Sequence, residues 1–123
     1  MNLVDSSGWL EYFAGGAKAD IFAPAIEDTA NLVVSTINIF EVFKKILRER
    51  DENAALQAVA IMEQGNVIQF SSALALSAAE ISHTKKIPMA DSIIYATALS
   101  TNAVLWTQDA DFAELEGVKY FTK

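Results

Sequence analysis

The stretch IPMADSIIYATAL, from Ile87 to Leu99, predicts the apolar helix around which the rest of the chain is organised. Apolar or small residues lie nearly all the way round this helix, which is the pattern of a buried helix. Pro88 suits its first helical position, where the missing N–H costs nothing. Asp91 falls in the first turn, although a buried carboxylate is unfavourable without a partner. It either stabilises the positive end of the helix dipole or points into a site that holds a cation.

The composition predicts one globular domain, residues 1–123, with a sizeable core. Of the 123 residues, 52% are hydrophobic and 20% are charged, so the chain can bury enough apolar surface to fold. No apolar run approaches the roughly 18 residues that suggest a membrane-spanning helix. The chain reaches Asp5 without a basic N-terminal region, so we expect no signal peptide and a cytoplasmic location.

Residue types that are absent or rare exclude several kinds of chemistry. The chain has no cysteine, which excludes disulfides, thiol nucleophiles and cysteine-ligated zinc. Its one histidine, His83, excludes sites that need two imidazoles. The net charge of −7 argues against wrapping nucleic acid by charge alone, because such binding depends on Lys and Arg. A nucleic-acid substrate therefore needs a local basic patch, or metal ions that first neutralise a cluster of acids.

Short apolar strands alternate with helices along the chain. Strands are predicted at residues 2–5, 32–36, 67–70, 104–107 and 118–121. Helices are predicted at residues 9–14, 17–28 with a break or kink near Pro24, 38–50, 53–64, 71–84, 88–99 and 112–115. The alternation predicts a three-layer α/β sandwich, with a central, mainly parallel sheet of about five short strands flanked by helices.

Four acidic residues fall at strand ends or helix beginnings. Asp5 and Asp109 each follow a predicted strand, whereas Glu41 and Asp91 each lie in the first turn of a predicted helix. In open parallel sheets, ligands bind outside the carboxyl ends of the strands, near a switch in strand order. We therefore expect these four carboxylates to converge on one crevice.

Helix capping is the alternative explanation for these acids. Asp5 can cap the helix that follows it. Asn38 is a suitable N-cap, and Glu41 three residues later completes a capping-box pattern. Asp111 starts a similar pattern and is predicted as an N-cap, which leaves Asp109 without such an explanation.

A cluster of carboxylates predicts a divalent-ion site. Carboxylates in one pocket repel each other, so proton uptake or a cation must relieve them. With no cysteine and one histidine, the oxygen ligands favour Mg²⁺ or Mn²⁺. Such a site suits phosphoryl chemistry, and two ions about 3.5–4 Å apart would act from both sides of the phosphorus. No Ser-His-Asp set and no P-loop supports nucleophilic catalysis or nucleoside-triphosphate hydrolysis.

Four segments carry a resemblance to a known family. They are LVDSS (residues 3–7), NIFEV (38–42), PMADSIIYATA (88–98) and LWTQDADF (105–112). In this order, and spanning nearly the whole chain, they resemble the PIN-domain ribonucleases, most of all the VapC-type toxins of bacterial and archaeal toxin–antitoxin pairs. Each motif alone is weak, whereas four in the family's order are specific.

The resemblance implies a metal-dependent endoribonuclease that leaves a 3′-hydroxyl and a 5′-phosphate. It implies Asp5, Glu41, Asp91 and Asp109 as the catalytic acids. Of these, Asp5, Asp91 and Asp109 are implied as ligands of Mg²⁺ or Mn²⁺, directly or through water. Glu41 is implied to complete the pocket or to orient the attacking water.

The resemblance also implies supporting residues and partners. Ser6 and Thr107 match positions of small hydroxyl residues beside the metal, and Asp111 is a candidate fifth acid. A homodimer and a cognate antitoxin, whose C-terminal segment occupies the active-site groove, are implied as well. The candidate RNA contacts are Lys44, Lys45, Arg48, Lys85 and Lys86, whose alternative role is a solvated surface.

Two functions of other classes stay open. A phosphoryl-accepting receiver domain has a similar length and binds Mg²⁺ through acids at strand ends. It requires an acceptor Asp after a central strand, but the strands at residues 32–36 and 67–70 end without one. In a non-catalytic binding module, the acids would serve only as helix caps and an exposed apolar groove would bind the partner. The candidates for that groove, which could equally belong to the core, are Trp9, Phe13, Ile39, Phe40 and Phe43.

Overall fold

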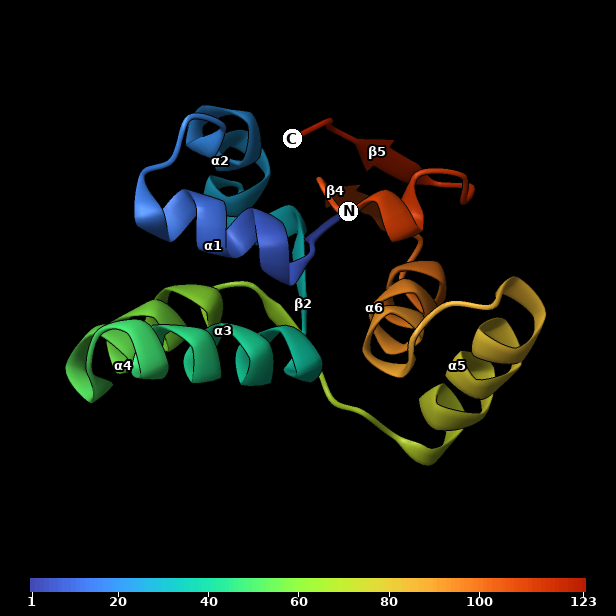
Figure 1. Ribbon diagram of the computed structural model, residues 1–123. Helices are drawn as coiled ribbons and strands as arrows, with labels where there is room; N and C mark the ends of the chain where they lie inside the picture. The colour runs from blue at the N-terminus through green and yellow to red at the C-terminus, as the bar shows by residue number, and fades with distance from the viewer.

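The computed structural model describes residues 1–123, which form a parallel five-stranded sheet between two layers of helices (Figure 1). The strand order is β3-β2-β1-β4-β5, and each neighbouring pair is parallel. The strands are β1 (Asn2–Val4), β2 (Leu32–Ser35), β3 (Asn66–Ile68), β4 (Val104–Thr107) and β5 (Val118–Tyr120). The predicted three-layer α/β sandwich with a central parallel sheet is confirmed.

Helices make up every crossover between the strands except the last. They are α1 (Ser6–Ala14), α2 (Ala19–Glu27), α3 (Thr36–Glu49), α4 (Glu52–Met62), α5 (Ser72–Lys85) and α6 (Met89–Ser100). Two short 3₁₀ turns, η1 (Thr29–Asn31) and η2 (Ala110–Phe112), precede β2 and follow β4. None of the helices has both the length and the apolar character needed to cross a membrane.

Alternate residues of the central strands face the two helical layers. Val4 and Val34 are fully buried in the core that α1, α2, α3 and α4 share, whereas Leu3 and Val33 are fully buried against α6. Successive side chains of a strand point to opposite faces, so a sheet covered on both sides needs uninterrupted apolar runs. Figure 1 shows α1 to α4 on one side of the sheet and α6 with α5 on the other.

The helix α6 is buried along most of its length, as its apolar sequence predicts. Residues 92–98 are all buried. Leu74 and Ala78 of α5 pack on its outer side, against Ile93 and Ala96. Its start differs by one residue from the prediction, because Pro88 has an extended ψ of 159° and is the N-cap.

Two predicted helix caps are wrong. Ser35, not Asn38, is the N-cap of α3, and its Oγ accepts a hydrogen bond from the N–H of Ile37 (3.2 Å). Asn38 closes the capping box instead of Glu41, which lies in the second turn. The predicted helix at residues 112–115 is replaced by the turn η2, whose N-cap is Asp109, not Asp111. In both cases the observed N-cap is a polar residue two or three positions before the predicted one.

The expected break near Pro24 is absent. The helix α2 continues from Ala19 to Glu27 with Pro24 inside it. Pro24 is exposed, so its ring lies on the side of α2 that faces solvent. The neighbouring Ala25 and Ile26 are buried and hold this part of α2 against the sheet.

Close packing at Gly8 generates a stability prediction. A Cβ atom at this position would lie 2.6 Å from Val4 Cγ1 and 2.9 Å from Phe22 Cδ1. Gly8→Ala must therefore push α1 away from β1 and α2, and we expect it to lower the free energy of unfolding in urea by about 1–3 kcal/mol. Ala60→Ser, at an exposed position of α4, is the control and should change it by less than about 0.5 kcal/mol. Equal stability of Gly8→Ala and the wild type would contradict this packing.

Candidate functional site

The carboxyl ends of β1, β2 and β4 meet where the strand order reverses. From β1 the chain proceeds to β2 and β3 on one side, and later to β4 and β5 on the other. Open parallel sheets bind ligands at such a switch point. A cleft of about 880 Å³ opens there, and its lining includes Asp5, Glu41, Asp91 and Asp109. The structure thus brings the four acids singled out in the sequence to one cleft.

Each of the four acids is held by the beginning of a helix or turn. Asp5 directly follows β1 and caps α1, as the capping alternative predicted, by accepting a hydrogen bond from the N–H of Gly8 (3.2 Å). Asp91 lies in the first turn of α6, and Glu41 in the second turn of α3. Asp109 caps η2 by accepting from the N–H of Asp111 (2.9 Å). Asp5 and Asp109 therefore both cap a helix or turn and line the cleft, whereas Asp91 and Glu41 line the cleft without capping.

Asp5 is buried and accepts hydrogen bonds through both of its carboxylate oxygens. Its Oδ1 also accepts from the Ser7 hydroxyl (2.8 Å), and its Oδ2 accepts from the Thr107 hydroxyl (2.8 Å). Thr107 in turn accepts from the N–H of Asp109 (2.8 Å), which ties β1 to the loop after β4. Burial raises the pKa of Asp5 to about 6, although the hydrogen bonds from Ser7 and Thr107 favour the charged form.

Asp91 lies among the other carboxylates. Its burial, the largest cause, and the negative charges of Asp109, Asp111, Glu41 and Asp5 raise its pKa to about 7. Asp91 therefore titrates close to neutral pH when no cation relieves the repulsion. A bound cation would displace the proton of Asp91, because it would neutralise the negative charge of the surrounding carboxylates.

Three carboxylates are close enough to share one ion. Oxygen atoms of Asp91, Asp109 and Asp111 all lie within 4.8 Å of one another. This set differs from the sequence-implied ligands by having Asp111 in place of Asp5. Carboxylate oxygens are the ligands that hard divalent cations take, so these residues fit a Mg²⁺-like ion and do not fit a soft metal.

Glu41 is oriented by a hydroxyl group from another element. Ser6, the first residue of α1, donates a hydrogen bond to Glu41 Oε1 (2.6 Å). Both residues line the cleft. The family motif predicted that Ser6 lies beside the metal. In the structure, Ser6 forms a direct hydrogen bond with Glu41.

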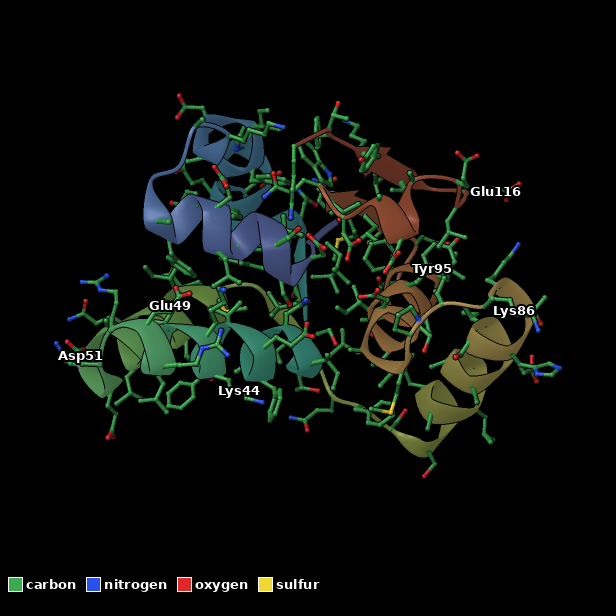
Figure 2. The ribbon with its side chains drawn as sticks, viewed as in Figure 1. Lys44, Glu49, Asp51, Lys86, Tyr95 and Glu116 are labelled. Carbon is green, nitrogen blue, oxygen red and sulfur yellow. The ribbon has the colours of Figure 1, made fainter.

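The positive charges at the cleft are mostly not those singled out in the sequence. Of the five candidate RNA contacts, Lys45 lines the cleft, and it pairs with Glu49 (3.1 Å). Figure 2 shows Glu49 on the side of α3 that faces α1, Lys44 on the opposite side, and Lys86 at the far end of α5. Arg48 and Lys85 are also outside the cleft lining. The lining instead adds Lys18, Arg50 and Lys123, which sequence reasoning missed.

The structure gives little support to the two alternative functions. A receiver domain needs an accessible acceptor carboxylate at the end of a central strand. Here β2 ends at Ser35, and Asp5, which follows the central strand β1, is buried and accepts hydrogen bonds through both oxygens. Most side chains suggested for an apolar groove belong to the core. Trp9 is fully buried and stacks on Phe13 (centroids 5.6 Å apart), and Ile39 and Phe43 pack against the same cluster. Phe40, by contrast, is 61% exposed.

The PIN domain family model matches residues 3–118 of the chain. Among solved structures, a toxin–antitoxin complex from Klebsiella pneumoniae is 25% identical, with a TM-score of 0.83 and full coverage of both chains. The Mycobacterium tuberculosis toxin VapC20, described as cleaving the sarcin–ricin loop, is 19% identical over 94% of this chain and 95% of that one, with a TM-score of 0.77. VapBC2 from Rickettsia felis, bound to a promoter DNA fragment, is 13% identical over 98% and 97%, with a TM-score of 0.75. None of the curated proteins compared with the chain matches it in sequence.

The raised pKa of Asp91 predicts how stability depends on pH when no metal is present. The folded protein binds this proton more tightly than the unfolded chain, so the resulting stability is complete below pH 3.8 and is lost as pH rises through about 7. Without metal, we expect Asp91→Asn to match the wild type near pH 4 but to melt at least about 4 °C higher at pH 8. Differential scanning calorimetry in EDTA measures this. A variant that melts lower than the wild type at pH 8 would contradict the assignment.

Proposed function

The chain belongs to the PIN domain family, and on that basis we propose that it is an endoribonuclease, the toxin of a toxin–antitoxin pair, with residues 1–123 as its nuclease domain. The observation that carries this proposal is the set of carboxylates at the carboxyl ends of β1 and β4, where Asp91, Asp109 and Asp111 converge. The likeness to a solved toxin–antitoxin complex over the full length of both chains supports the same function.

The cofactor in this proposal is Mg²⁺ or Mn²⁺. Asp91 and Asp109 would hold it, with Asp5 and Asp111 as the further oxygen donors. Asp5 Oδ2 accepts one hydrogen bond and keeps capacity for a second interaction. When bound, the ion would neutralise charge and lower the pKa of a water molecule near the scissile phosphate. The preference for oxygen ligands supports either metal and does not separate the two.

The protein's own groups position the water and the phosphate. Glu41, held by Ser6 at one oxygen, orients the attacking water and accepts its proton. The water oxygen forms the new bond to phosphorus as the bond to the 3′-oxygen breaks. The 3′-oxygen takes up a proton from solvent, so the products carry a 3′-hydroxyl and a 5′-phosphate. Asp5 keeps the loop after β4 in place through Thr107, and so keeps Asp109 at the cleft.

The RNA backbone is proposed to lie along the basic rim of the cleft. We define this rim as Lys18, Lys45, Arg50 and Lys123, which line the same cleft as the acids. They are four of the nine Lys and Arg residues in a chain with a net charge of −7. The other basic residues suggested by the sequence lie outside the cleft and would contact RNA only if it extended beyond the cleft. They are Lys44 and Arg48 on α3, and Lys85 and Lys86 at the C-terminal end of α5.

An antitoxin and a second copy of the chain are the proposed protein partners. In the Klebsiella pneumoniae structure the similar chain belongs to a toxin–antitoxin complex, and the Rickettsia felis pair is bound to promoter DNA. By this analogy a cognate antitoxin would occupy the cleft with its C-terminal segment and would exclude RNA. A homodimer is proposed on the same family basis.

Removal of the clustered carboxylates tests the proposed reaction. Asp91→Asn and Asp5→Asn should each slow the cleavage of a defined RNA by at least about 100-fold, because each removes charge that holds the ion. EDTA should abolish cleavage by the wild type, and Mg²⁺ or Mn²⁺ should restore it and raise the melting temperature by mass action. Asp20→Asn, at an exposed acid of α2, is the matched control and should cleave normally. Full activity of Asp91→Asn with Mg²⁺ present, or wild-type cleavage that persists in EDTA, would overturn the proposal.

Salt dependence tests the basic rim. Lys18→Ala and Arg50→Ala should weaken RNA binding, and each should reduce the slope of log Kd against log salt by roughly 0.7 for each single-strand phosphate that the variant no longer neutralises. Turnover at saturating RNA should stay unchanged, because neither side chain forms an ion pair or hydrogen bond with Asp5, Glu41, Asp91 or Asp109. Lys86→Ala should have a smaller effect. A larger effect of Lys86→Ala than of Arg50→Ala would move the RNA path from the cleft to α5.

A further inference from the structure

A buried amide links the end of β2 to the carboxylate at the cleft. Asn38, in the first turn of α3, has no exposed surface. Its Oδ1 accepts a hydrogen bond from the N–H of Ser35 (3.2 Å), and its Nδ2 donates to Ser6 Oγ (3.1 Å). Ser6 Oγ then donates to Glu41 Oε1 (2.6 Å). Three successive hydrogen bonds therefore connect the backbone at the end of β2 to Asn38 on α3, Asn38 to Ser6 on α1, and Ser6 to Glu41 on α3.

The chemistry of the groups gives this chain of hydrogen bonds one direction. A backbone N–H only donates, so the amide oxygen of Asn38 must face Ser35. The amide nitrogen also only donates, so the Ser6 oxygen must accept there. The Ser6 proton then points to Glu41, whose carboxylate only accepts. The bond at 2.6 Å has the length of a charge-assisted O–H···O⁻ bond, which is among the stronger kinds in proteins.

Helix capping alone does not account for both ends of Asn38. The capping box requires an acceptor for the N–H of Ser35, and Ser, Thr, Asp or Glu would provide one. The donor half of the amide serves no backbone group and contacts Ser6 alone. This hydrogen bond occupies an acceptor site of Ser6 Oγ, whose proton is donated to Glu41.

We propose that Asn38 is a positioning residue, which acts through Ser6 to hold one oxygen of Glu41 and leaves the other for the attacking water. This inference rests on the proposed ribonuclease function. Asn38 touches neither the carboxylate cluster nor the basic rim directly, so its effect should fall on turnover rather than on RNA affinity or metal affinity.

The test compares Asn38→Ala, Ser6→Ala and their double variant with Ser35→Ala as the matched control. Ser35→Ala removes the other half of the same capping box, the bond to the N–H of Ile37, and leaves Asn38, Ser6 and Glu41 intact. It therefore measures how a weaker N-terminal cap of α3 affects turnover when the hydrogen bonds among Asn38, Ser6 and Glu41 are kept. Asn38→Asp is a second variant, which keeps the volume and the capping acceptor but has no amide donor, in case Asn38→Ala fails to fold.

Two readouts are measured on these proteins. The first is the ¹³C resonance of the Glu41 side-chain carboxyl carbon in the metal-free protein, which should move in Asn38→Ala and Ser6→Ala but not in Ser35→Ala. The second is kcat for a defined RNA, which should fall roughly 10-fold in Asn38→Ala and in Asn38→Asp, with the Kd values for RNA and Mn²⁺ unchanged. The double variant should be no slower than Ser6→Ala, because Asn38 acts through Ser6.

Four results would overturn the positioning role alone, provided that the wild-type protein cleaves RNA. They are losses of kcat that add in the double variant, a Glu41 resonance that does not respond to Asn38→Ala, equal losses of kcat in Ser35→Ala, and unchanged turnover in Asn38→Asp. A wild-type protein that cleaves no RNA with any divalent ion overturns the proposed function as well.

Discussion

Repulsion among carboxylates at one edge of the sheet is the constraint on which this structure depends. Five acids come together there, and four of them act on Asp91, whose pKa rises to about 7. Such an arrangement is unfavourable for a protein without a ligand, because each charge raises the free energy of the others. The fold tolerates it because a proton or a divalent ion compensates part of the charge. Stability and the proposed chemistry therefore depend on the same electrostatic repulsion.

The scaffold that imposes this repulsion is rigid because it is buried on both sides. α6 packs between the sheet and α5, and the hydroxyl of Tyr95 donates to the backbone of Glu116 (2.8 Å), which ties the helix to the loop before β5 (Figure 2). Asp91 cannot move far from the cleft without disturbing this core. On the other side, the hydrogen bonds between Asp5, Thr107 and Asp109 join β1 to β4. Binding groups on such elements keep their geometry before a ligand arrives.

The sequence predicts the layers well and the caps poorly. Runs such as residues 32–34 specify strands buried on both faces, and the apolar residues of α6 specify a buried helix, because burial patterns depend on many residues at once. Caps depend on one side chain each. Ser35 and Asn38 both satisfy the same local pattern, as do Asp109 and Asp111, and only contacts with other elements decide between them. The basic rim was not predicted for a similar reason, since Lys18, Arg50 and Lys123 are far apart in the sequence and meet at the cleft.

The location of a bound divalent ion tests the central claim most directly. A crystal grown or soaked with Mn²⁺ at neutral pH gives an anomalous difference map that locates the ion without reference to activity. We expect a peak in the cleft, within coordination distance of the carboxylate oxygens of Asp91 and Asp109. A cleft without such a peak at saturating Mn²⁺, or an ion bound only elsewhere on the surface, would contradict it.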